Sequence, residues 1–222
     1  MNKILSAAIP ALLLLASCSI IRQGKMVLNP AEMIPFNDAP YIITEHKNTA
    51  ADAEMPDWVI AYIDGGLHGV EALAAYQGQY VFVAKTEGNN FTALNHWMAG
   101  FSPELDFPRL AAARVEARFF SAAPLPDQEY GTYYEALVPA ASDYPWTGAV
   151  RQNDFWIRKN YIPTVDDAEK ETWEFMILLT IDKMSFSGQL QKVFGSVNPK
   201  PPPSRDQMSA VNRVKDRFFE NF

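Results

Sequence analysis

The only cysteine of the 222-residue chain, Cys18, closes the sequence Leu15-Ala16-Ser17-Cys18. A cysteine thiol can form a thioether with a diacylglyceryl group, and small neighbouring residues allow a signal peptidase to cleave directly before it. This pattern is typical of bacterial lipoproteins and predicts that Cys18 becomes the lipid-carrying first residue of the mature protein. The alternatives are an ordinary secretory signal with an unrelated cysteine, or an N-terminal anchor helix.

The segment before Cys18 has the layout of a signal peptide. Lys3 supplies a positive charge, and residues 4–16 are almost wholly apolar. A membrane-spanning helix needs about 20 apolar residues, so this run suits a signal better than a membrane span. We therefore expect residues 1–17 to be removed. Ser19 stands where an aspartate retains many lipoproteins at the inner membrane, and this favours the outer membrane.

The residue types that usually perform catalysis or hold metals do not form a recognisable motif. The three histidines, His46, His68 and His96, lie far apart, and none belongs to an H-x-x-x-H or H-x-H pair. No G-x-S-x-G sequence is present, and the glycine-rich run Asp64 to Gly69 lacks the features of a phosphate-binding loop, so we interpret it as a turn. The sequence predicts no catalytic residue, no metal and no cofactor.

Aromatic residues are concentrated in one stretch of the chain, which contains Tyr130, Tyr133, Tyr134, Tyr144, Trp146, Phe155, Trp156 and Tyr161. Aromatic rings beside carboxylates can form a groove for a sugar or a peptide. The same rings can instead pack a sheet against helices, and this interpretation is favoured. If a ligand or partner surface exists, its expected members are Tyr130, Tyr134, Trp146, Trp156, Phe218 and Phe222.

The charge of the chain limits its partners. The net charge is -7, and removal of residues 1–17 takes away one basic residue, Lys3, so that 18 basic residues face 26 acidic ones. An acidic surface argues against nucleic acid, whose binding needs a basic patch. It also argues against adhesion of the protein body to anionic lipid. We therefore expect the acyl chains on Cys18 to hold the membrane.

Several segments have the β-branched and aromatic composition of strands, namely 41–44, 79–85, 130–138, 147–159 and 173–181. Helical segments lie between and after them. Together they predict an α+β fold, in which about four mainly antiparallel strands pack against a central helix.

The central helix is expected to follow an N-cap at Asp106 and to run over 107–120. Its predicted core-facing residues are Leu110, Ala113, Ala117 and Phe120. Residues 91–101 carry an apolar stripe at helical spacing, and a further short helix is predicted over 186–194.

The C-terminal region combines a stiff linker with an amphipathic helix. Residues 197–203 are rich in proline and predict an extended connection. Ser204 and Gln207 form a capping box at the start of a helix predicted over 204–222. Its apolar face, which includes Phe218 and Phe222, is expected to dock onto the domain's own sheet, with a partner helix or groove as the alternative.

The order of these motifs resembles the lipoprotein 20 family of small envelope lipoproteins over residues 56–193. The family also includes a flagellar basal-disk lipoprotein and is similar to the N-terminal domain of flagellar assembly protein T. The resemblance is carried by residues 56–59, 80–85, 110–118, 147–156 and 173–182, whereas residues 90–101 are an insertion relative to the family. It implies a non-enzymatic α+β domain for envelope structure or assembly, and it transfers no catalytic residue.

The sequence therefore predicts five regions: a signal peptide (1–17), a lipidated tether (18–55), an α+β domain (56–196), a proline-rich linker (197–203) and a C-terminal helix (204–222). The favoured function is a lipid-anchored envelope protein that acts through protein–protein contacts. The alternative is a protein that binds or hydrolyses cell-wall or glycan material through the region Tyr130 to Tyr161.

Overall fold

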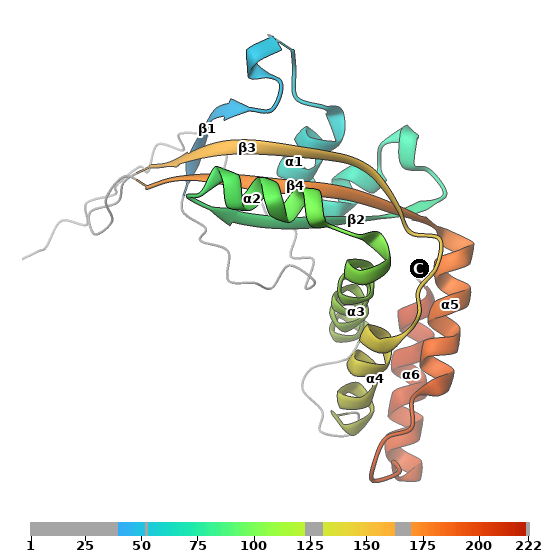
Figure 1. The fold of residues 1–222 in the computed structure, drawn as a ribbon. Coiled ribbons are helices and arrows are strands. Elements are labelled where there is room, and N and C mark those ends of the chain that lie inside the picture. The colour runs from blue at the N-terminus through green and yellow to red at the C-terminus, as the bar shows by residue number, and fades with distance from the viewer. Residues whose placement is uncertain (1–39, 52, 123–130, 163–169, 221–222) are drawn as a thin grey trace, which may run out of the picture.

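The structure, a computed structural model, describes residues 40–51, 53–122, 131–162 and 170–220 (Figure 1). Four strands form one antiparallel sheet in the order β1-β3-β4-β2. Their bounds are β1 (Tyr41–His46), β2 (Gln79–Gly88), β3 (Val150–Tyr161) and β4 (Lys170–Asp182). The α+β class predicted from the sequence is confirmed.

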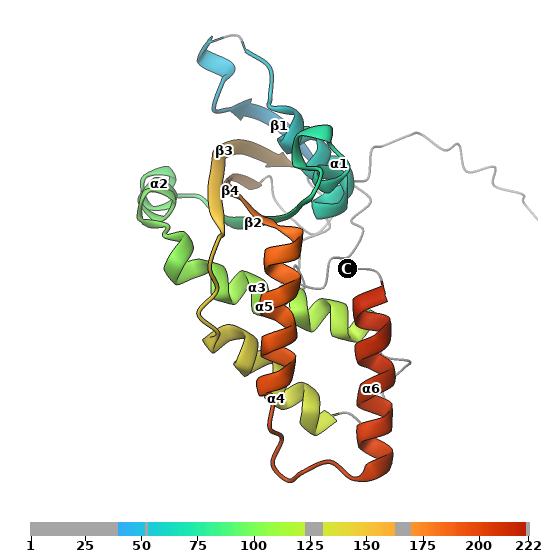
Figure 2. The same cartoon turned by 90° about the vertical axis from the view of Figure 1, so that its right-hand side faces the viewer.

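The central strand β4 is covered on both faces because its residues are apolar at odd and even positions alike. Met176 and Leu178 belong to a core cluster on one side, and Phe175 and Ile177 belong to another. Helix α1 (Asp57–Glu71) covers the first side. Helix α2 (Phe91–Gly100) lies on the opposite side, as Figure 2 shows.

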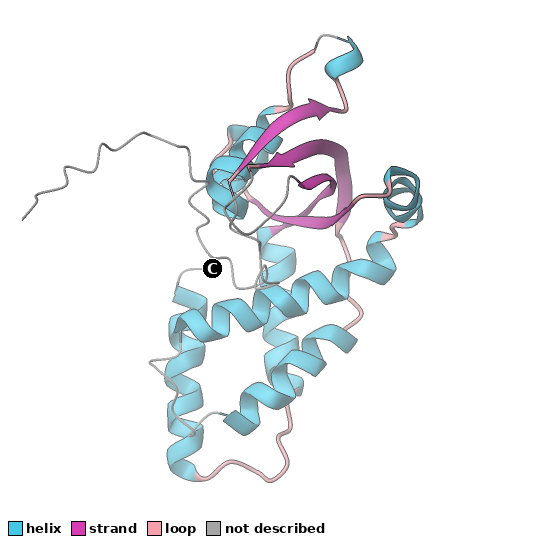
Figure 3. Cartoon of the chain, turned by 90° about the vertical axis from the view of Figure 1, so that its left-hand side faces the viewer, coloured by secondary structure: helices cyan, strands magenta, loops and turns pink. Residues whose placement is uncertain are grey.

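Four further helices extend the second core away from the sheet (Figure 3). They are α3 (Pro103–Ala122), α4 (Gly131–Asp143), α5 (Lys183–Ser196) and α6 (Arg205–Glu220). One continuous cluster joins Phe82 of the sheet, through Phe107 and Phe186, to Phe218 of α6. The C-terminal helix therefore docks within its own chain. It packs against α3 and contacts Phe194 of α5, and not the sheet as predicted.

The predicted strand over 130–138 is wrong, because residues 131–143 form helix α4. Tyr133, Leu137 and Ala141 are buried at four-residue intervals, which is the period of one helix face. The tyrosines of this segment give it a strand-like composition, but its buried face packs against α3 and α5 as a helix. The first residue of the predicted strand, Tyr130, lies outside the described residues.

Helix α3 begins earlier than predicted and presents a different face to the core. Its first residue is Pro103, so Asp106 lies in the first turn, where its carboxylate accepts the Ser102 main-chain N–H at 2.9 Å. Val115 and Phe119 are fully buried, whereas Phe120, expected in the core, is 51% exposed. Alanines occur on several sides of this helix and leave its apolar stripe ambiguous.

Strand β1 lies within the region 18–55 that the sequence assigns to the tether. It pairs with β3 and so forms one edge of the sheet. Short 3-10 helices follow β1 and α1, at η2 (Thr49–Ala51) and η3 (Ala74–Tyr76). The sheet therefore begins before residue 56, because the alternating apolar residues Tyr41 and Ile43 face its inner side.

Glycines bend α1 sharply in the middle. Gly65 and Gly66 leave the helical conformation, and Gly66 has a φ of 60° and a ψ of -153°, a combination available essentially to glycine alone. The predicted turn over 64–69 is thus limited to these two residues, because the helix resumes at Leu67. The bend brings Gly69 against the carbonyl oxygen of Ala61.

Replacing Gly69 with alanine is expected to destabilise the fold, because the new Cβ would overlap the Ala61 carbonyl oxygen, which is rigid main chain. Such overpacking costs about 1–3 kcal/mol of unfolding free energy. Gly188→Ala in α5 is the matched control, since nothing lies within 4 Å of its added Cβ. We expect this variant to be neutral or more stable. Thermal unfolding of both variants would show equal melting temperatures if the close approach had no effect.

Candidate functional site

A buried lysine on the α1 side of the sheet is the first candidate for a functional group. Lys159 follows Phe155 and Ile157 at alternate positions of β3, so it faces the same covered side, and it is 1% exposed. Its ammonium pairs with Glu174 of β4 and, at 3.3 Å, with Glu87 of β2. A buried charge is costly unless it is paired, so these carboxylates explain its position.

Hydroxyl groups complete the arrangement. Tyr161 and Thr172 each donate a hydrogen bond of 2.7 Å to the same carboxylate oxygen of Glu87. The ring of Tyr41 in β1 lies 4.5 Å from Nζ of Lys159. All four strands thus contribute to one group, which we call the Lys159 cluster: Tyr41, Glu87, Lys159, Tyr161, Thr172 and Glu174.

The protonation states of the Lys159 cluster determine what it can do. Burial by itself lowers the pKa of Lys159, but the charge and the hydrogen bond of Glu174 outweigh burial and raise that pKa above its ordinary value. Burial and the hydrogen bond to Glu87 raise the pKa of Tyr161 to about 12. Near neutral pH the lysine is protonated and has no lone pair with which to attack a substrate. The cluster is suited to holding four strands together.

The opposite side of the sheet carries an aromatic cluster next to α2. Phe91, the first residue of α2, is 38% exposed. Its ring meets those of Trp156 and Trp173 edge to face, with centroids 5.3 Å and 5.9 Å away, and also packs on Phe175. Both tryptophans are half-buried. These rings therefore form a partly exposed aromatic surface on β3 and β4.

Charged residues lie beside this aromatic surface near the start of α2. The Arg158 guanidinium lies 4.9 Å from the centroid of the Trp173 ring. It also forms ion pairs with Glu171 at 2.6 Å and with Glu45 at 3.4 Å. Arg158 is therefore held in place over the tryptophan by two carboxylates.

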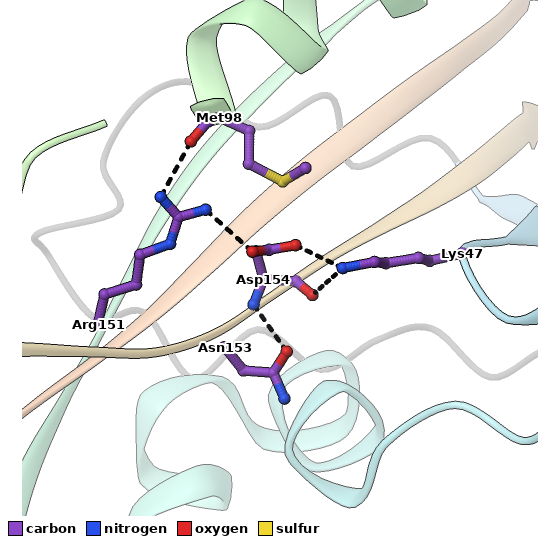
Figure 4. Close-up of polar contacts among 5 residues, drawn as sticks. All are labelled: Lys47, Met98, Arg151, Asn153 and Asp154. Atoms are coloured by element: carbon purple, nitrogen blue, oxygen red, sulfur yellow. Dashed lines mark hydrogen bonds and ion pairs between the residues drawn. The ribbon is translucent and has the colours of Figure 1, made fainter. Parts of the chain in front are cut away.

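A second charged group lies near the end of α2 (Figure 4). Arg151 donates one hydrogen bond to the main-chain oxygen of Met98 at 3.1 Å and another to Asp154 at 2.9 Å. Lys47 pairs with the other carboxylate oxygen of Asp154 at 2.5 Å. Burial raises the pKa of Asp154, but the hydrogen bonds from Lys47 and Arg151 outweigh burial and lower it. The group fastens α2 to β3.

Helix α2 itself contains no charged residue. Its exposed positions are occupied by small or neutral side chains: Phe91, Thr92, Ala93, Asn95, His96, Ala99 and Gly100. Covering the exposed positions of α2 desolvates no Asp, Glu, Lys or Arg side chain, and the cores of protein interfaces are depleted in such charged residues. We call α2, Trp156, Trp173 and the groups around Arg158 and Arg151 the α2 face.

The residues predicted as a ligand or partner surface do not come together. Trp146 is 8% exposed and stacks on Phe186, and Phe218 is fully buried against Phe194. Tyr134 lies in α4, where it donates a hydrogen bond to Glu116 of α3. Among the described members only Trp156 belongs to the α2 face. Cys18, Tyr130 and Phe222 lie outside the described residues.

Sequence patterns missed a charged pair at the edge of β2. Arg114 of α3 donates to the main-chain oxygen of Val81 at 2.8 Å and pairs with Glu71 of α1. Glu71 in turn accepts the main-chain N–H of Val81 at 3.0 Å. Side chains from two helices, α1 and α3, thus satisfy the outward main-chain groups of Val81 at this edge of the sheet. Only the fold brings these residues together.

Two further observations concern metal sites and membrane-spanning helices. Within the described ranges, no group of three or more His, Cys, Asp or Glu residues is arranged to hold a metal ion. In the same ranges, no helix has both the length and the apolar character needed to cross a membrane.

Comparisons with known proteins identify no relative. No family model matches the chain, and no curated protein and no solved structure matches it significantly.

Proposed function

We propose that the chain is a lipid-anchored envelope lipoprotein that acts without catalysis, through protein–protein contacts made by its α2 face. The observation that carries this proposal is the partly exposed aromatic surface of Phe91, Trp156 and Trp173 beside Arg158. Tryptophan and arginine dominate the binding energy of protein interfaces, typically near the centre of the buried area. Charges at the rim, here Glu45 and Glu171, contribute to specificity.

The location in the envelope follows from the sequence around Cys18, which supports a diacylglyceryl anchor at the outer membrane. A contact protein tied to a membrane needs a surface that stays available to partners. The α2 face belongs to the folded domain, well after the anchor in the chain. The resemblance to the lipoprotein 20 family stays a prediction and is consistent with this role.

The aromatic and acidic groove of the alternative hypothesis has no comparable support. Two aromatic residues of the Tyr130 to Tyr161 region, Tyr133 and Trp146, are buried in the core. A glycan site needs aromatic faces and polar groups that converge on one cleft. The residues of the Tyr130 to Tyr161 region are instead divided between the sheet and the helices.

Photo-crosslinking in cells tests the proposed contact. A photoreactive amino acid at Ala93, exposed on α2, is expected to give a discrete crosslinked product with another envelope protein. The same group at Ala75, exposed in η3, is the matched control and should not give that product. Adding Phe91→Ala should reduce the Ala93 product several-fold, because the variant removes an aromatic anchor.

The fold must be intact for this result to be informative, so the melting temperature of Phe91→Ala is measured in parallel. Equal crosslinking from Ala93 and Ala75, or a product that is insensitive to Phe91→Ala in a folded protein, would contradict the proposal.

A further inference from the structure

The two edges of the sheet differ in whether their outward main-chain groups have hydrogen-bond partners. At the β2 edge, Glu71 and Arg114 occupy the outward main-chain groups of Val81. Edge strands present N–H and C=O groups that can pair with another strand, and proteins commonly cover them in this way. The other edge is β1, labelled at the margin of the sheet in Figure 2.

The register of β1 shows which of its main-chain groups face outward. The Ile162 N–H donates to the Pro40 oxygen at 2.8 Å, and Ile42 stands opposite Asn160. Hydrogen-bonded pairs alternate along an antiparallel ladder, so Ile42 bonds toward β3. Tyr41 and Ile43 therefore direct their N–H and C=O groups away from the sheet. Neither residue's main chain has an outward partner among the described residues.

The first part of this edge has no charged side chain, and the bulge of β1 lies at its end, between Ile43 and Glu45. The run Tyr41-Ile42-Ile43-Thr44 contains no charge, and the Ile42 side chain is 59% exposed. At the far end, the outward N–H of His46 is taken by the Thr49 hydroxyl at 2.8 Å. The open part of the edge is thus short, apolar and centred on Ile42.

We propose that β1 pairs with β1 of a second copy of this chain, antiparallel and about a two-fold axis at Ile42. In this register Tyr41 stands opposite Ile43 of the second copy, so that the outward groups of both residues form four main-chain hydrogen bonds. The two Ile42 side chains lie side by side and cover each other. The result is one continuous eight-stranded sheet.

A second copy fits this edge because the edge is complementary to itself. An isologous contact brings each group against its own symmetry mate, and an uncharged strand suffers no repulsion in that arrangement. The contact is small and therefore weak in dilute solution. Lipid anchors on both copies raise the effective concentration at the membrane. The inference thus draws on the proposed anchor, but it does not need the α2 face.

Disulfide trapping in cells tests both the pairing and its register in the full-length chain. In Ile42→Cys the two Cα atoms at the two-fold axis would be about 4.5 Å apart, within the range for a disulfide. Thr44→Cys is the matched control on the same exposed strand, where the two positions would be roughly 13 Å apart along the strands. After oxidation we expect several-fold more dimer from Ile42→Cys. The parent chain, whose only cysteine is Cys18, should give none.

A third variant tests the hydrogen bonds. Ile43→Pro removes an outward N–H without removing a bond to β3, and proline is tolerated at sheet edges. Added to Ile42→Cys, it should abolish the dimer while the protein stays folded by circular dichroism. Three results would overturn the proposal: no dimer from Ile42→Cys, equal dimer from both cysteine positions, or a disulfide product with a different protein. Because photo-crosslinking from Ala93 does not depend on β1, the two proposals can fail separately.

Discussion

Lys159→Met is expected to lower the unfolding free energy by about 3–5 kcal/mol, because it leaves the Glu174 carboxylate buried without its partner. Glu174 is 6% exposed at its side chain, so water cannot replace the lysine without opening the sheet. Chemical denaturation measures the loss. Lys192→Met, at an exposed position of α5, is the control and should change stability by less than about 0.5 kcal/mol.

The double variant Lys159→Met/Glu174→Leu distinguishes the net contribution of the ion pair from the cost of leaving one of its charges unpaired. Replacing a buried ion pair by apolar residues is often neutral, so the double variant should regain much of the stability lost in the single one. A single variant as stable as the wild type, or a double variant with the full sum of both losses, would contradict the pairing described for Lys159.

The same cluster predicts a dependence on pH. The pKa of Lys159 is raised above its ordinary value of 10.5, so its stabilising effect is complete below that pH and is lost as the pH rises beyond it. Burial raises the pKa of Glu87, but Lys159 and the hydroxyl groups outweigh burial and lower it below 4.5. The stabilising effect of Glu87 is therefore lost as the pH falls through the acidic range. The stability difference between wild type and Lys159→Met should shrink above pH 10.5.

Phe218→Ala is expected to cost about 3–5 kcal/mol, because Phe218 is fully buried between α6 and its neighbours. Its ring lies 4.8 Å from that of Phe194, and its main-chain oxygen accepts a hydrogen bond from Arg118. Met208→Ala on the same helix is the control, since Met208 is 39% exposed. Its effect should be below about 1 kcal/mol.

Thermal unfolding of both α6 variants distinguishes a docked helix from an independent one. If Phe218→Ala melted at the wild-type temperature, α6 would not belong to the core of this domain, and the alternative of a helix reserved for a partner would regain support.

Local sequence patterns predict the structure correctly where interactions between residues close in the sequence determine it. The capping box is confirmed, because Ser204 N–H donates to the Gln207 side chain at 2.8 Å and Gln207 N–H donates to the Ser204 hydroxyl at 3.2 Å. The strand predicted over 173–181 is also present, within β4. Seven of these nine residues are apolar, more than in any other predicted strand, and this leaves no competing interpretation.

The predictions failed where several interpretations had similar local support. Tyr133 and Leu137 fit a strand by composition and a helix by spacing, and packing against α3 and α5 decides in favour of the helix. In α3, alanines on several sides make the buried face ambiguous in the sequence, and it is packing against α4 and α6 that determines it. Composition alone cannot resolve such cases, because the energy that decides them comes from tertiary contacts.

The candidate sites could not be predicted from the sequence for a different reason. Glu87, Lys159 and Glu174 come from three strands, and only the register of the sheet brings them together. One signal was available: Lys159 and Glu174 follow the apolar residues Phe155, Ile157 and Met176 on the same inward face of their strands, and an inward charge must have a partner. For the α2 face the signal was a ten-residue helix without any charge.

The anchor at Cys18 is the part of the proposed function on which the rest depends, and mass spectrometry of the protein purified from membranes tests it most directly. We expect the mature chain to begin at Cys18, with a diacylglyceryl group on its sulfur, and Cys18→Ala to accumulate as an uncleaved precursor that keeps residues 1–17. A mature chain that begins elsewhere, or a Cys18→Ala variant that is processed and partitions into detergent like the wild type, would contradict the account.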